Sequence, residues 1–231
     1  KELDNPLPRW WFNMFIITII FGVVYLFLYP GLGNYKGYLN WTSHNQWEAE
    51  MAHADEHYKP VFAKFANLSV EEIAGNDTAR QMGQRMFNNN CAVCHGQAGT
   101  GAYGFPNLSD NDWLYGGSGA NIKATISNGR AGAMPPWGAI IGEDGVRNVT
   151  SYVLGLSGQK VDAKAAAQGQ TTYQAMCIAC HGADGKGNQV LGAPNLTDDI
   201  WLYGGSFEKV AHSIRQGRNG AMPAHSSLLS E

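Results

Sequence analysis

The four cysteines of this 231-residue chain form two copies of one short motif. Each copy reads Cys-x-x-Cys-His, and together they comprise Cys91, Cys94 and His95, then Cys177, Cys180 and His181. Cysteines three residues apart on a helical turn share a face, so both thiols can add across the two vinyl groups of one porphyrin. The adjacent imidazole can then bind the iron. The motif therefore predicts two covalently bound haem c groups.

Three other uses of paired cysteines have to be weighed against haem. These are a disulfide within each pair, a zinc ribbon and a thioredoxin-like redox pair. Zinc ribbons separate their cysteine pairs by roughly 15–20 residues, whereas Cys91 and Cys177 lie 177 − 91 = 86 residues apart. None of the three requires a histidine directly after both pairs, so the pattern favours haem.

The two motifs belong to a longer internal repeat. Four segments of the first copy recur 88 positions later, between Pro194 and Pro223. They are Pro106-Asn107-Leu108, Trp113 to Gly117, Ile126 to Arg130 and Gly132 to Pro135. The offset changes from 86 to 88 residues between His181 and Pro194, where a loop can absorb the difference. The repeat predicts two homologous domains, 71–158 and 159–231.

Met134 and Met222 occupy the same place in the repeat and are each followed by proline. They lie 39 and 41 residues after His95 and His181, the histidines of their own copies. A thioether on a proline-fixed loop is the expected sixth ligand of an electron-transfer haem. A single methionine is more often core filling, but repetition at an aligned position favours ligation. The rivals in the second copy, His212 and His225, have no histidine at the aligned places of the first.

Two further pairs of repeated side chains can donate hydrogen bonds to haem propionates. They are Arg130 and Arg218, whose guanidinium groups suit carboxylates, and Trp113 and Trp201. The alternatives are solvent exposure for the arginines and structural packing for the tryptophans.

A helix upstream of each motif would position the cysteines. In the first copy it should begin with Asp77 as N-cap and present Gly83 and Phe87 on one face. Glycine and an aromatic residue recur at these places as Gly169 and Tyr173, which would let a second helix cross closely. We expect that second helix at 143–156 in the first copy. Its counterpart in the second copy would follow Glu231, so we expect a native continuation by a helix of about 15 residues.

The chain also holds a candidate membrane anchor near its start. No charged residue lies between Arg9 and Lys36, and the apolar run 10–29 would reach about 30 Å as a helix. A signal peptide has a shorter apolar region of roughly 7–15 residues, so the run predicts a transmembrane helix. Lys1 and Arg9 against Lys36 give a thin positive-inside bias. A connecting helical segment, 36–70, should lead into a short helix that a capping box at Ser69-Val-Glu-Glu72 opens.

The composition narrows the class of protein. A formal net charge of -3 gives no basic excess of the kind that neutralises phosphates, so a nucleic-acid partner is not expected. Glycine is abundant, at 29 residues, and charged residues make up only 15%. A small domain wrapped around a large apolar macrocycle needs less core of its own, which makes glycine-rich loops tolerable.

In these motifs the chain resembles the dihaem c subunit of cbb3-type cytochrome c oxidase, the CcoP or FixP family. The resemblance rests on the membrane entry 4–11, the exit 29–34 and the tandem Cys-x-x-Cys-His domains, and it covers the whole chain. It implies an all-α fold, with one N-terminal transmembrane helix followed by two tandem class I cytochrome c domains. It also implies anchoring in the bacterial inner membrane, with the haem domains in the periplasm. Family members can carry a further N-terminal segment.

The resemblance implies an electron relay. Electrons would come from a soluble or membrane c-type cytochrome, or from a quinol-oxidising complex, and cross two His/Met haems. They would pass to the monohaem subunit and then to the haem–copper subunit that reduces oxygen and pumps protons. The chain itself would be a carrier without bond chemistry. The alternatives are the anchored subunit of another periplasmic dehydrogenase or reductase, a dihaem peroxidase and a cofactor-free structural membrane protein.

Overall fold

The computed structural model describes residues 6–229, and they divide into two units. The first unit extends to Asn67 and the second begins at Leu68. Lys1, which contributes to the positive-inside bias, and the start of the membrane-entry segment 4–11 lie outside the described residues.

The first unit contains α1 (Arg9–Leu28) and α2 (Ser43–Ala63). Among the described residues, α1 is the one helix long and apolar enough to cross a membrane, and it matches the predicted span within one residue at each end. Its side chains are almost all exposed, as suits a lipid-facing helix. Tyr29 ends it in an extended conformation before Pro30.

The second unit begins with α3 (Val70–Gly75), where the predicted capping box is confirmed between Ser69 and Glu72. α4 (Asp77–Asn90) follows, but its N-cap is Asn76, whose side chain accepts a hydrogen bond from the Ala79 amide. The prediction of Asp77 as N-cap is therefore wrong by one residue, because the asparagine before it already holds the cap.

Both sequence repeats give the same series of elements. The first provides α4, α5 (Ala92–His95), α6 (Gly119–Asn128) and β1 (Arg130–Met134), and the second provides α8 (Ala163–Met176), α9 (Ile178–His181), α10 (Phe207–Gln216) and β2 (Arg218–Met222). Between the two series lies α7 (Gly138–Leu156). The architecture is mostly helical, as predicted, with two short strands added.

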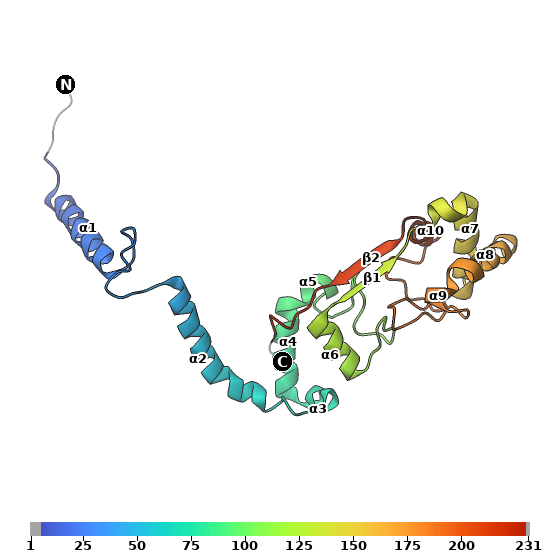
Figure 1. Cartoon of the computed structure of the whole chain (residues 1–231), viewed down its shortest axis with the longest axis horizontal. Helices are drawn as coiled ribbons and strands as arrows, with labels where there is room; N and C mark the ends of the chain where they lie inside the picture. The colour runs from blue at the N-terminus through green and yellow to red at the C-terminus, as the bar shows by residue number, and fades with distance from the viewer. Residues whose placement is uncertain (1–5, 230–231) are drawn as a thin grey trace, which may run out of the picture. The chain divides into compact units, whose positions relative to one another are not determined.

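The two strands pair with each other across the repeats (Figure 1). They run antiparallel, with Gly132 opposite Gly220 at the centre. At the ends, Arg130 faces Met222 and Met134 faces Arg218. The partners at the centre are equivalent positions of the repeat, so the ribbon relates the two repeats by a local two-fold symmetry.

The main buried core lies on α7, α8 and α10. It consists of Val146, Val149, Val153, Leu154, Tyr173, Val210, Ala211 and Ile214. At the crossing of α7 and α8, a Cβ on Gly169 would lie 2.0 Å from the Asn148 carbonyl oxygen. The helix expected at 143–156 therefore exists, but the prediction that it crosses the first copy at Gly83 is wrong. In the described part of the chain nothing lies within 4 Å of a Cβ built on Gly83.

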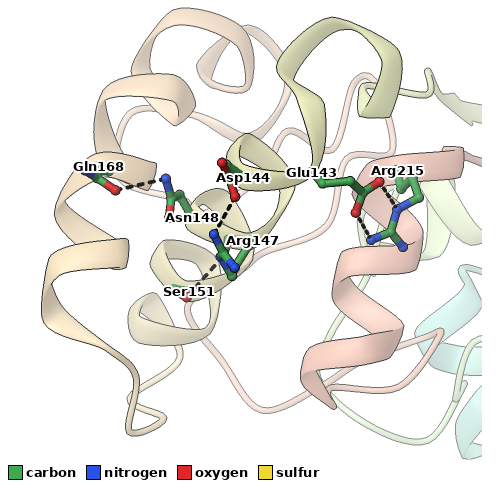
Figure 2. A network of polar contacts seen from close by, with 7 residues as sticks. All are labelled: Glu143, Asp144, Arg147, Asn148, Ser151, Gln168 and Arg215. Carbon is green, nitrogen blue, oxygen red and sulfur yellow. Dashed lines mark hydrogen bonds and ion pairs between the residues drawn. The ribbon is translucent and has the colours of Figure 1, made fainter.

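Polar contacts reinforce the position of α7 against the second repeat (Figure 2). Arg215 on α10 donates from Nε and Nη2 to both carboxylate oxygens of Glu143, at 2.8 and 2.7 Å. Asn148 donates to Gln168 on α8 at 3.1 Å. These hydrogen bonds connect residues of the predicted first domain, 71–158, with residues of the predicted second domain, 159–231.

Candidate haem-binding sites

Each Cys-x-x-Cys-His motif lies on a short helix that continues a longer one. Cys91 ends α4 and begins α5, and Cys177 does the same between α8 and α9. None of the four cysteines forms a disulfide in the described chain. Burial raises the pKa of the Cys91 thiol, and raises that of Cys177 to about 11. Cys91, Cys94 and Cys177 are half-buried, whereas Cys180 is exposed.

The two motif histidines are held by equivalent contacts. Nδ1 of His95 lies 3.0 Å from the Pro106 carbonyl oxygen, and Nδ1 of His181 lies 3.1 Å from that of Pro194. Since a carbonyl can only accept, each contact requires a proton on Nδ1, which leaves Nε2 unprotonated for a metal. Burial lowers the pKa of His181, which favours the neutral imidazole that ligates iron.

Tight glycine turns bring the chain back against each histidine. The amides of Gly101 and Gly187 donate to the carbonyls of His95 and His181, both at 2.8 Å. Both glycines have positive φ, and a Cβ on either would lie within 2.5 Å of a backbone oxygen. The glycine content of the sequence thus reflects loops that close around the sites.

The repeated arginines occupy equivalent positions beside each site. Nε of Arg130 donates to the Thr125 hydroxyl and Nε of Arg218 to the Ser213 hydroxyl, both at 2.9 Å. Each guanidinium also covers a tyrosine ring of its own copy. Arg130 lies 4.8 Å from the centre of Tyr115, and Arg218 lies 4.3 Å from that of Tyr203. Both arginines are half-buried, so simple solvent exposure does not describe them.

The second repeat contains buried donors that have no partner among the described residues. They are Nε1 of Trp201 and Nη2 of Arg218. Leaving such donors unpaired costs about 1–3 kcal/mol each, so they call for an acceptor. A haem propionate is an acceptor of the right charge, and both donors belong to the set predicted for that role. The residues present therefore fit a haem. Trp113 and Arg130 show no such unpaired atom.

The methionines lie at the far ends of the two strands. Met134 is half-buried and packs against the core formed by α7, α8 and α10, which Cys177 and Trp201 also contact. Met222 is half-buried at the other end of the ribbon, opposite Arg130. Neither methionine therefore ends beside the arginine that begins its own strand.

The rival histidines are separated by the fold. His212 lies within α10, one turn from its end. His225 follows β2, and its backbone amide donates to the carbonyl of Ile126 in the first repeat. Its buried Nδ1 has no partner among the described residues.

The sequence reasoning missed the residues that hold the predicted ones in place. Pro106 and Pro194 orient the histidines, Tyr115 and Tyr203 stack on the arginines, and Thr125 and Ser213 bind the arginines. All are repeated at an offset of 88 residues, so the repeat itself carried the signal. The repeat could not show which of these residues contact each other in the folded chain. Among the described residues, no three side chains of His, Cys, Asp or Glu come together as a metal-binding cluster.

Comparison with known proteins gives family matches in both units. Residues 1–36 match a family described as the N-terminal domain of cytochrome oxidase-cbb3, FixP. Residues 78–153 and 164–231 each match one described as cytochrome C oxidase, cbb3-type, subunit III. The cbb3-type cytochrome c oxidase subunit CcoP of Rubrivivax gelatinosus is 50% identical, covering 100% of this chain and 76% of the relative. The FixP subunit of Azorhizobium caulinodans is 42% identical, covering 100% and 84%.

Proposed function

Since the chain belongs to the CcoP/FixP family of cbb3-type cytochrome c oxidase subunits, we propose that it relays electrons through two haem c groups to the oxygen-reducing part of that complex. Domains 71–158 and 159–231 would each carry one haem. The observation that supports this best is the duplicated site, in which a proline carbonyl orients each motif histidine in the same way.

The residues of the chain bind and orient the haems. The thiols of Cys91, Cys94, Cys177 and Cys180 would form the thioethers, and His95, His181, Met134 and Met222 would ligate the irons. Trp113, Arg130, Trp201 and Arg218 would donate to the propionates. When bound, each haem supplies an iron that accepts and releases one electron. With a histidine and a methionine holding each iron, the chain would act as an electron carrier, and the bond-making chemistry would belong to other subunits of the oxidase.

The location follows from where haem is attached. The α1 helix would anchor the chain in the bacterial inner membrane, with the haem domains in the periplasm, where c-type haem is joined to apoproteins. After Arg9, its side chains are uncharged and almost all exposed, which supports a lipid environment.

The partners are the other subunits of the oxidase and an electron donor. In each transfer, a reduced c-type cytochrome or a quinol-oxidising complex loses one electron, which this chain passes to the monohaem subunit and so to the haem–copper subunit. Residues 36–158 carry 8 basic and 11 acidic side chains, which can steer a basic donor. The rate of association with such a donor should then fall as salt is added. A salt-independent rate would count against this steering.

The decisive experiment is mass spectrometry of the purified native complex. We expect this chain to carry two haem masses and to remain with subunits that contain haem b and copper. A chain without haem would refute the proposal. Two haems in a complex with a different dehydrogenase or reductase would instead support the alternative subunit role.

A further inference from the structure

We propose that His53 and His57 on α2 form a binding site for a divalent transition metal of the zinc class. The two imidazoles supply the protein ligands, and water fills the remaining positions of the metal. The pair lies in the first unit of the chain, whereas all the residues that would hold the haems lie in the second. The inference therefore goes beyond the proposed function and does not depend on it.

The spacing of the two histidines is the first observation. Both lie within the helix that runs from Ser43 to Ala63, and four residues separate them. Residues four apart share one face of a helix. Two histidines at this spacing are a recurring pair of zinc ligands, because one face then presents two nitrogen donors to the same ion. α2 thus carries a chelate on its surface.

The two imidazole rings already lie side by side. Their centroids are 4.1 Å apart, and their planes are inclined to each other by 26°. Both side chains are exposed, so no core packing holds either ring in one orientation. Small rotations about the side-chain bonds are therefore enough to direct two nitrogens at one ion.

A hydrogen bond determines which nitrogen of His57 is available. Its Nδ1 lies 3.0 Å from the backbone carbonyl oxygen of His53. A carbonyl can only accept, so Nδ1 carries the proton and Nε2 keeps its lone pair. Histidines that ligate metals commonly donate from their second nitrogen to a carbonyl or carboxylate in this way. The backbone of α2 thus holds His57 in the tautomer that binds a metal.

The charge of α2 favours a cation at this place. The helix contains four acidic residues and a single lysine, Lys59, which bonds to Asp55. Glu50 and Glu56 lie three residues before and three residues after His53, so both are its neighbours on the helix surface. An excess of negative charge raises the local concentration of cations. A divalent ion would offset part of this charge.

The remaining histidine of α2 provides a contrast within the same helix. Nε2 of His44 lies 3.2 Å from a carboxylate oxygen of Glu48, and its ring stacks on Trp47. It has no second histidine one turn away. In the described part of the chain, no third His, Cys, Asp or Glu completes a cluster with His53 and His57. Their site is therefore open to water and exchangeable, unlike a closed structural zinc site with four protein ligands.

Zinc titration of the haem-loaded full chain tests the site. By isothermal calorimetry we expect one Zn²⁺ to bind here and to be removed by a chelator. His53→Ala and His57→Ala should each lower the affinity about tenfold or more, because the second nitrogen of a chelate binds intramolecularly. The matched control His44→Ala should keep the wild-type affinity. A wild-type chain that binds no zinc, or that binds it no better than His53→Ala/His57→Ala, would overturn the proposal.

A shifted pair separates a chelate from a simple count of histidines. The variant His57→Ala/Tyr58→His keeps the number of imidazoles but places the pair five residues apart, on different faces of α2. It should bind Zn²⁺ as weakly as His57→Ala alone. Wild-type affinity in the shifted variant would show that the two imidazoles act independently, which contradicts the site.

Chemical modification locates the ion in the unsubstituted chain. Diethyl pyrocarbonate modifies imidazole nitrogens that hold no metal, and peptide mass spectrometry reports each histidine separately. Zn²⁺ should slow the modification of His53 and His57 several-fold and leave His44 reactive. If Zn²⁺ protects other histidines and not this pair, the ion binds elsewhere and the proposal is wrong.

Discussion

The two repeats share their motifs but not their cores. In the second repeat, α8 buries Gly169 and Tyr173, and α10 buries three side chains. In the first repeat, α4 buries only Ala79 and α6 buries none. The difference arises because α7, which the chain order assigns to the first copy, covers the second. A duplicated sequence therefore specifies two equal sites without deciding which copy each connecting helix completes.

The largest expected effect comes from a steric clash at the crossing of α7 and α8. Gly169→Ala should destabilise the protein by about 3 kcal/mol, because the new Cβ would lie 2.0 Å from the Asn148 carbonyl oxygen. The measurement is chemical denaturation of the haem-loaded chain, followed by circular dichroism.

Gly83→Ala is the matched control in the first repeat. The described residues leave its Cβ position open, so alanine should stabilise α4 by about 0.5–1 kcal/mol. An equal loss from both substitutions would show that the two helices are covered alike and would contradict the comparison.

This pair of glycines also shows how far the sequence could predict the structure. The repeat, the membrane helix, the capping box and all four helices that carry or flank the motifs follow from local patterns. The glycine–aromatic pattern correctly indicated a close helix crossing at Gly169 but not at Gly83. It could not indicate the partner, since Gly83 and Gly169 offer almost the same surface. Which of the two helices α7 crosses depends on the direction in which the strand after Arg130 leaves its repeat.

The candidate site was also predicted from the sequence only in part. The sequence identified the histidines, cysteines and arginines as candidate site residues. The residues that contact them, such as Pro106, were visible only as repeated positions without an assigned role. Which carbonyl meets which imidazole is a tertiary fact, because the partners lie 11 and 13 residues apart around a glycine-rich loop.

The next largest effect should come from the unpaired indole of the second repeat. We expect Trp201→Phe to cost about 2 kcal/mol in the haem-loaded chain, because the buried indole that we propose as a propionate donor is lost. One haem should also shift to a lower reduction potential, since a propionate without its donor places more negative charge near the iron. Denaturation and redox titration measure the two changes. Trp113→Phe should cost less, because its indole is not among the buried unpaired donors, and equal effects would remove this distinction.

Tyr173 differs from its equivalent Phe87 by a hydroxyl group that donates to the Gly182 carbonyl at 2.8 Å. Tyr173→Phe, which copies the first repeat, should cost about 1 kcal/mol at neutral pH. Burial raises the pKa of Tyr173 to about 12 from 10.0. The folded state therefore holds this proton more tightly, so stability is full below about pH 10 and falls between pH 10 and about 12. Alkaline denaturation curves should show that fall in the wild type and a smaller one in the variant, and identical curves would argue against a buried phenol.

The smallest effect concerns the ion pair between α7 and α10, which the first repeat cannot form because Ser127 is the equivalent of Arg215. The Arg215 guanidinium holds the pKa of Glu143 below its usual range. A lowered carboxyl pKa contributes stability above the pKa of the unfolded chain, and that stability is lost as pH falls through the folded value. Both groups meet solvent, so Glu143→Gln should lower the melting temperature only slightly at neutral pH and low salt, and not at all in acid or high salt. The control Asp144→Asn removes a neighbouring charge whose partner, Arg147, lies on the same helix. If the melting temperatures of the two variants respond alike to salt and acid, the ion pair with α10 does not stabilise the packing of α7 on the second repeat.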